Sequence, residues 1–137
     1  MFFNKKHKEE NTSNLVKIAA LLIHTAKIDQ NYSIEEEEII KKTLVSLGAE
    51  QSDLDNLIRK ASKSEENANQ ILDFTREIKN LEEMDKIKIV KSLWKIIYSN
   101  KDADIYETNL MRRLAGLLYI DSKVMGDIKE EIKKEYL

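Results

Sequence analysis

The chain has 137 residues, of which 42% are hydrophobic, and this length is typical of one domain that buries a sizeable apolar core. It contains no cysteine, which excludes disulfides, thiolate nucleophiles and zinc sites with cysteine ligands. Its 23 basic and 25 acidic residues give a net charge of −2, and we expect no nucleic acid partner because the release of counterions from phosphates requires a basic surface.

The start of the chain and its apolar runs predict where the protein resides. The apolar run over residues 18–23 is far shorter than the about 20 residues that cross a bilayer, so no transmembrane segment is expected. No apolar segment follows the charged start, which predicts a soluble, cytoplasmic protein without a secretory signal. Residues 1–11 are expected to form a flexible N-terminal tail or a short extra turn, followed by one helical domain over 12–137. As an alternative, Phe2 and Phe3 with the lysines behind them make a weak peripheral membrane contact.

Helices are expected nearly throughout, because the chain has no proline, three glycines and many Leu, Ile, Glu and Lys residues. Apolar residues spaced three and four apart predict an all-α fold of about seven helices. In chain order these helices cover about 14–28, 34–47, 52–61, 68–78, 82–99, 105–119 and 122–132. Ser33 is expected to start the second helix in a capping box with Glu36, and Gly48 to end it.

Two segments of the chain share one pattern, in which an apolar helix ends at a polar, acidic break and a second helix starts with a glutamate. Asp29 and Glu36 are seven positions apart in the first segment, and Asn100 and Glu107 are seven positions apart in the second. The two breaks can therefore be aligned residue for residue, which indicates a duplicated helix–loop–helix unit.

Several other charged and aromatic residues are expected to have structural roles. The polar residues 62–67 separate the third helix from the fourth. Glu82 and Lys86 form a favourable pair four residues apart on a solvated helix face, and Trp94 is expected in the core. The tyrosines that flank the acidic breaks either line a groove or pack at helix ends, and they are Tyr32, Tyr98, Tyr106 and Tyr119.

The duplicated helix–loop–helix pattern resembles that of the TerB-like family of tellurite-resistance proteins, and in particular that of its small single-domain branch. Each half of a family member carries a helix, an Asp-Gly turn and a glutamate seven positions after the aspartate. The matching stretches are Ala19-Ala20-Leu21-Leu22 before Asp29 and Glu36, and Leu93-Trp94-Lys95-Ile96-Ile97-Tyr98 before Tyr106-Glu107 and Leu110-Met111-Arg112-Arg113-Leu114-Ala115. The resemblance covers about residues 14–135 and implies a bundle with two pseudo-repeated helix–loop–helix halves.

The resemblance also implies a divalent cation, Ca²⁺ or Mg²⁺, because members of the family have been proposed to bind metal through these acids. The ligands that it implies here are Asp29, Glu36 and Glu107, and Asp102 and Asp104 are further candidates because they can compensate for Asn100 in the second break. Independently of the resemblance, side chains with oxygen atoms recur at alternate positions from Asp29 onward, and hard cations require several such oxygen ligands. An EF-hand is excluded, because Ile34 and Ile40 occupy the positions of its glycine and its closing glutamate.

The two breaks also depart from the family pattern. Gln30 and Lys101 replace the glycine after the acid, and Asn100 replaces the second acid, so a different turn geometry is expected. The alternative role for each acid is to cap a helix and offset the dipole at its N-terminus.

No motif of nucleophilic, acid–base or phosphate-binding chemistry is visible, so no enzyme activity is expected and no catalytic residue is assigned. The leading interpretation is a non-catalytic TerB-like binding or scaffold module, related to stress response, with a protein partner that the sequence does not identify. Tyr106, Arg112 and Arg113 are candidates for contact with that partner. Two alternatives stay open: a metal-dependent hydrolase or metal-sequestering protein that uses the same acids, and a bundle that associates with itself as a homo-oligomer.

Overall fold

A computed structural model describes residues 2–28, 32–68, 71–99 and 105–136, and within residues 2–11 and 105–108 it describes the backbone alone. Over these ranges the chain forms seven α-helices and no strand, which confirms the expected all-α fold. The helices are α1 (Phe2–Ala26), α2 (Ile34–Ser46), α3 (Leu54–Asn67), α4 (Leu72–Ile78), α5 (Glu83–Ser99), α6 (Ile105–Leu117) and α7 (Ser122–Tyr136). A short 3₁₀ helix, Gln51–Asp53, precedes α3.

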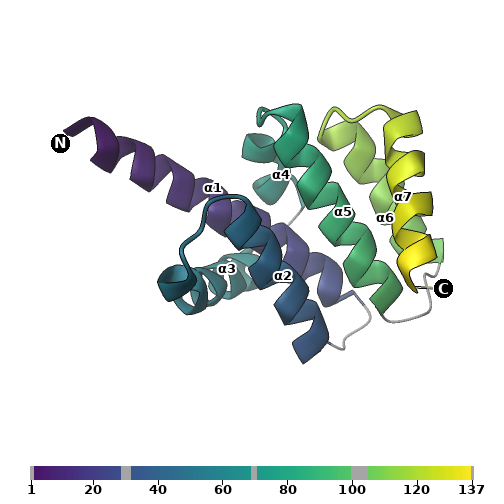
Figure 1. Ribbon diagram of the computed structural model, residues 1–137, viewed down its shortest axis with the longest axis horizontal. Helices are drawn as coiled ribbons and strands as arrows, with labels where there is room; N and C mark the ends of the chain where they lie inside the picture. Colours follow the sequence, from purple (N-terminus) through teal and green to yellow (C-terminus); the bar gives the residue numbers. More distant parts are fainter. Residues whose placement is uncertain (1, 29–31, 69–70, 100–104, 137) are drawn as a thin grey trace.

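The first helix begins much earlier than expected. α1 starts at Phe2, whereas the sequence pattern predicts its start near Asn14, after a flexible tail over residues 1–11. The expected start is wrong because residues 2–13 contain no glycine or proline, and each residue added to an existing helix gains one backbone hydrogen bond. Figure 1 shows this N-terminal part of α1 extending beyond the other helices. The division of the chain into a tail and a domain from residue 12 stays a prediction.

α3 continues through the polar stretch that is expected to separate two helices. The helix ends at Asn67, so residues 62–67 are helical and their expected role as a break is wrong. The reason lies in Glu65, whose carboxylate faces α1. Its oxygens lie 3.0 Å from Lys27 Nζ and 3.3 Å from His24 Nδ1. Polar side chains therefore join α3 to α1 at this point, and they do not interrupt the helix.

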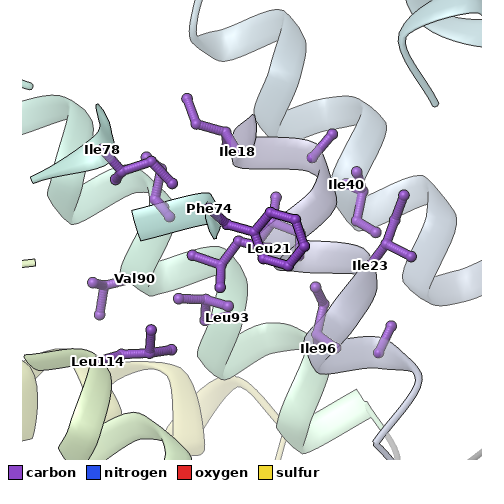
Figure 2. Packing of buried hydrophobic residues seen from close by; sticks show 14 of the residues in the cluster. Ile18, Leu21, Ile23, Ile40, Phe74, Ile78, Val90, Leu93, Ile96 and Leu114 are labelled. Carbon is purple, nitrogen blue, oxygen red and sulfur yellow. The ribbon is translucent and has the colours of Figure 1, made fainter. Parts of the chain in front are cut away.

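α1 is the central helix of the bundle and contacts α2, α3, α4 and α5. Every residue from Ile18 to Ile23 is buried, so this stretch is covered on all sides. The sequence spacing predicts a single buried stripe on this helix. It differs from the structure because spacing along the chain does not reveal how many helices surround a segment. Figure 2 shows the α1 side chains in the middle of the core, with partners from four other helices: Ile40, Phe74, Val90, Leu93, Ile96 and Leu114.

α5 is the second central helix, and it contacts α1, α2 and α7. Trp94 is buried on α5, as expected, and its ring stacks on Tyr98 at a centroid distance of 5.8 Å. The ammonium of Lys129, from α7, lies 5.4 Å from the centroid of the same ring. α1 and α2 are the helices of the first predicted helix–loop–helix unit, and α5 and α6 are those of the second. The pseudo-repeat of the two halves stays a prediction.

Local sequence signals determine both ends of α2. The hydroxyl of Ser33 accepts a 3.1 Å hydrogen bond from the Glu36 N–H, and the Glu36 carboxylate accepts a 2.8 Å bond from the Ser33 N–H. This reciprocal pair confirms the expected capping box. At the other end Gly48 has φ +110°, and its N–H and that of the next residue donate to α2 carbonyls at 3.0 and 2.9 Å. Glycine suits this Schellman motif because the position requires a positive φ.

Candidate functional site

The two predicted acidic segments connect helix ends that lie at the same end of the bundle. α1 and α5 run in the same direction, and Figure 1 shows their C-terminal ends on the same side of the molecule as the starts of α2 and α6. Contact between α1 and α5 holds these ends in a fixed relation. Both acidic segments of the sequence therefore connect helix ends on this side of the molecule.

Glu36 is the predicted ligand whose side chain the structure describes. It is 0% exposed, and the Ser33 N–H bond orients one of its carboxylate oxygens toward the start of α2. A carboxylate at this position is stabilised by the positive end of the helix dipole. The capping role that the sequence offered as an alternative is thus confirmed for Glu36, while its role as a cation ligand stays a prediction.

Tyr32 adds a polar group beside this cap. Its hydroxyl is buried and has no hydrogen-bond partner among the described residues. Burial raises the pKa of Tyr32 well above its usual value of 10, and the negative charges of Glu37 and Glu36 raise it further. The phenol therefore stays neutral next to two carboxylates. Tyr32 is one of the tyrosines that flank the acidic breaks in the sequence, and its burial beside the cap of α2 matches packing at a helix end, the second of its two expected roles.

The other four predicted ligands are described in part or not at all. Asp29, Asp102 and Asp104 lie outside the described residues. Glu107 belongs to the first turn of α6, as does Tyr106, which is predicted to contact a partner, and only the backbone is described for both. Their part in a cation site or an interface stays a prediction.

Arg112 and Arg113 lie together on the exposed face of α6. Both side chains are exposed, while Met111 and Leu114 on either side of them are buried. The pattern follows from the helical period, which turns two adjacent positions outward when their flanking positions pack inward. The predicted contact residues of this helix are therefore accessible to a partner.

Among the described side chains, no group of three or more His, Asp or Glu residues is placed to hold a metal ion. Within the same part of the chain, no helix is long and apolar enough to cross a membrane.

Comparison with protein families gives a match that covers most of the chain. The family described as tellurite resistance protein TerB matches residues 15–130. Its description names a resistance phenotype and no chemical reaction. Comparisons with curated proteins and with solved structures give no match. The matched range includes α1 from Leu15 onward, all of α2 to α6 and most of α7. The all-α bundle and the extent of this match agree, and the chain belongs to the TerB family.

Proposed function

We propose that this protein is a non-catalytic, cytoplasmic binding module that contacts a protein partner in a stress response and binds Ca²⁺ or Mg²⁺ at its acidic inter-helix segments. The link to stress rests on the resistance phenotype in the description of the family. The non-catalytic role rests on a sequence without a cysteine nucleophile and without a recognisable catalytic or phosphate-binding motif.

The observation that carries the proposal is the location of four helix ends on the same side of the bundle. The C-terminal ends of α1 and α5 and the starts of α2 and α6 lie on one side of the bundle. Asp29 lies in the segment between α1 and α2, before Glu36, and Asp102 and Asp104 lie in the segment between α5 and α6, before Glu107. Hard cations require several oxygen ligands, and two acidic segments together offer more of them than one segment alone.

The experiment is a calorimetric titration of Ca²⁺, Mg²⁺, Mn²⁺ and Zn²⁺ into chelator-stripped protein, repeated with the double variant Asp29→Asn, Glu36→Gln. Glutamine at position 36 keeps an acceptor for the Ser33 N–H bond, so α2 retains its cap while the site loses a charge. Alanine at this position would remove the cap as well, and a loss of binding could then reflect a frayed helix.

The matched control is Glu38→Gln, which removes one charge from the exposed face of the same helix. We expect saturable heat for the wild type and the control and none for the double variant. Absence of heat for every ion, with an unchanged melting temperature, would remove the cation from the proposal. Turnover of a phosphoester substrate with added metal would instead overturn the non-catalytic assignment.

Contact with a protein partner is proposed to use the exposed face of α6, because Arg112 and Arg113 are accessible there next to the first turn that carries Tyr106. Charge reversal of both arginines should abolish capture of the partner without changing the helical content. A mass that rises with protein concentration would show that the partner is a second copy of this chain.

A further inference from the structure

A cleft of about 320 Å³ opens between α2, α5 and the C-terminal end of α7, away from the acidic segments in sequence. Four lysines line it: Lys42 from α2, and Lys88, Lys91 and Lys95 from α5. The three α5 lysines are three and four positions apart, a spacing that places them on one helix face. This volume lies at the lower end of the range of small-molecule sites, which is about 300 to 1,000 Å³.

The acidic residues of the chain do not neutralise all of this charge. Lys91 Nζ lies 3.5 Å from a Glu131 carboxylate oxygen of α7, and Lys88 Nζ lies 4.0 Å from that of Asp85. Among the described residues, no carboxylate lies within ion-pair distance of Lys42 or Lys95. α5 has no acidic residue after Asp85, although acids outnumber bases in the whole chain. The cleft therefore holds an excess of positive charge on an acidic protein.

The inner wall of the cleft is polar and ordered. Thr43 and Ser92 are almost fully buried, and their hydroxyls are hydrogen-bonded to each other across the α2–α5 contact. The Thr43 hydroxyl is also 2.8 Å from the Ile39 carbonyl, and the Ser92 hydroxyl is 3.0 Å from the Lys88 carbonyl. Buried hydroxyls that contact each other fix the two helices at this point, which sets the positions of the lysines around them.

Tyr136 closes the cleft from α7. Burial raises the pKa of its hydroxyl above 10, and the charges of Glu35 and Glu135 raise it further. A tyrosine hydroxyl can donate a hydrogen bond to an anion. The carboxylates of Glu35 and Glu135 act on this hydroxyl and oppose an anion on this side of the cleft.

We propose that this lysine cleft, formed by Lys42, Thr43, Lys88, Lys91, Ser92 and Lys95, is a binding site for a small anion that carries phosphate groups. Lysine ammoniums bind phosphate as point charges. Several ammoniums around one cleft can contact several phosphate oxygens of the same ligand. The concave shape favours a free anion over the phosphate of a lipid surface.

The test uses inorganic pyrophosphate, titrated into the isotopically labelled protein in a buffer with a metal chelator and followed by amide chemical shifts. We expect saturable shifts confined to residues 39–46, 88–95 and the end of α7. The double variant Lys42→Gln, Lys95→Gln should weaken binding at least about tenfold, since each hydrogen bond to a charged group contributes about as much as a tenfold change in affinity.

The control variant is Lys60→Gln, Lys63→Gln, which removes the same charge from exposed lysines of α3 that do not line the cleft. Equal weakening in the control, or shifts that do not saturate, would overturn the site and leave only screening of surface charge. Co-sedimentation with phosphatidylcholine vesicles that contain phosphatidic acid, without pyrophosphate binding, would overturn the small anion in favour of a lipid headgroup. Because no divalent cation is present, this outcome is independent of the cation titration.

Discussion

The ammonium of Lys86 donates a 3.1 Å hydrogen bond to the main-chain carbonyl of Leu118, the residue that follows α6. Lys86 is 6% exposed, and its Nζ also lies 3.5 Å from the carbonyl of Lys79, the C-cap of α4, and 3.5 Å from a Glu83 carboxylate oxygen. One cation therefore joins the C-terminal ends of two helices, where the helix dipoles are negative and the last carbonyls lack helical partners.

Removing this ammonium should destabilise the fold. Lys86→Met keeps most of the side-chain volume but leaves the two carbonyls without their donor, so we expect the free energy of unfolding to fall by about 1 to 3 kcal/mol. Urea denaturation followed by circular dichroism measures the change. The control is Lys123→Met on the exposed start of α7, which should change stability by less than about 0.5 kcal/mol. Equal effects of the two variants would show that Lys86 does not act through its carbonyl contacts.

Tyr119 occupies a position that favours glycine. The N–H of Ile120 donates to the Ala115 carbonyl at 2.9 Å and that of Tyr119 to Gly116 at 3.3 Å, which forms a second Schellman motif, and Tyr119 has φ +57°. A side chain in this left-handed region costs about 1 to 2 kcal/mol. We therefore predict that Tyr119→Gly is more stable than Tyr119→Ala by about 1 kcal/mol in thermal denaturation.

The comparison of these two variants isolates the backbone, because both lose the contact of the Tyr119 ring with the Lys79 ammonium at 5.6 Å. Equal stability of the glycine and alanine variants would show that the positive φ is not a source of strain. The Tyr119 side chain is 67% exposed, and its contact with Lys79 would then be the remaining contribution of this residue to stability.

Tyr32 should make the protein sensitive to alkaline pH. Its pKa is raised in the folded state, so the stabilisation is complete below pH 10 and is lost as the pH rises through the folded pKa, since only the unfolded state ionises in that window. The free energy of unfolding should fall by at most about 1.4 kcal/mol per pH unit for this group.

The variant Tyr32→Phe should flatten this decline, and the measurement is urea denaturation between pH 9 and pH 11, a window placed about the usual tyrosine value of 10. Tyr119→Phe serves as the control because that ring is exposed. An identical pH profile for wild type and Tyr32→Phe would contradict the assignment.

Sequence patterns predict the features of this fold that depend on neighbours along the chain. The capping box of Ser33 and Glu36 and the glycine at the end of α2 were predictable because each involves residues within one helical turn. The start of α1 and the length of α3 were not, because helix-compatible polar residues look the same whether they continue a helix or end it.

Contacts between distant segments are the part that the sequence could not supply. Glu82 and Lys86 look like a solvated pair, whereas Lys86 is buried against Leu118, 32 positions away, and its carboxylate neighbour is Glu83. The lysine cleft has a partial signal, the absence of acids on α5 after Asp85, but Lys42 joins it through the packing of α2. The acidic segments were identified from their spacing alone, and their geometry lies outside the described residues.

The burial of residues Ile18 to Ile23 on every side of α1 imposes an order of events on protein synthesis. This stretch leaves the ribosome before any of the helices that cover it, and α5 completes the cover only after residues 83–99 have emerged. A nascent chain that stops before Glu83 exposes an apolar helix to chaperones and proteases. The two predicted halves are therefore not independent folding units, because the helix of the first half is buried by the helix of the second.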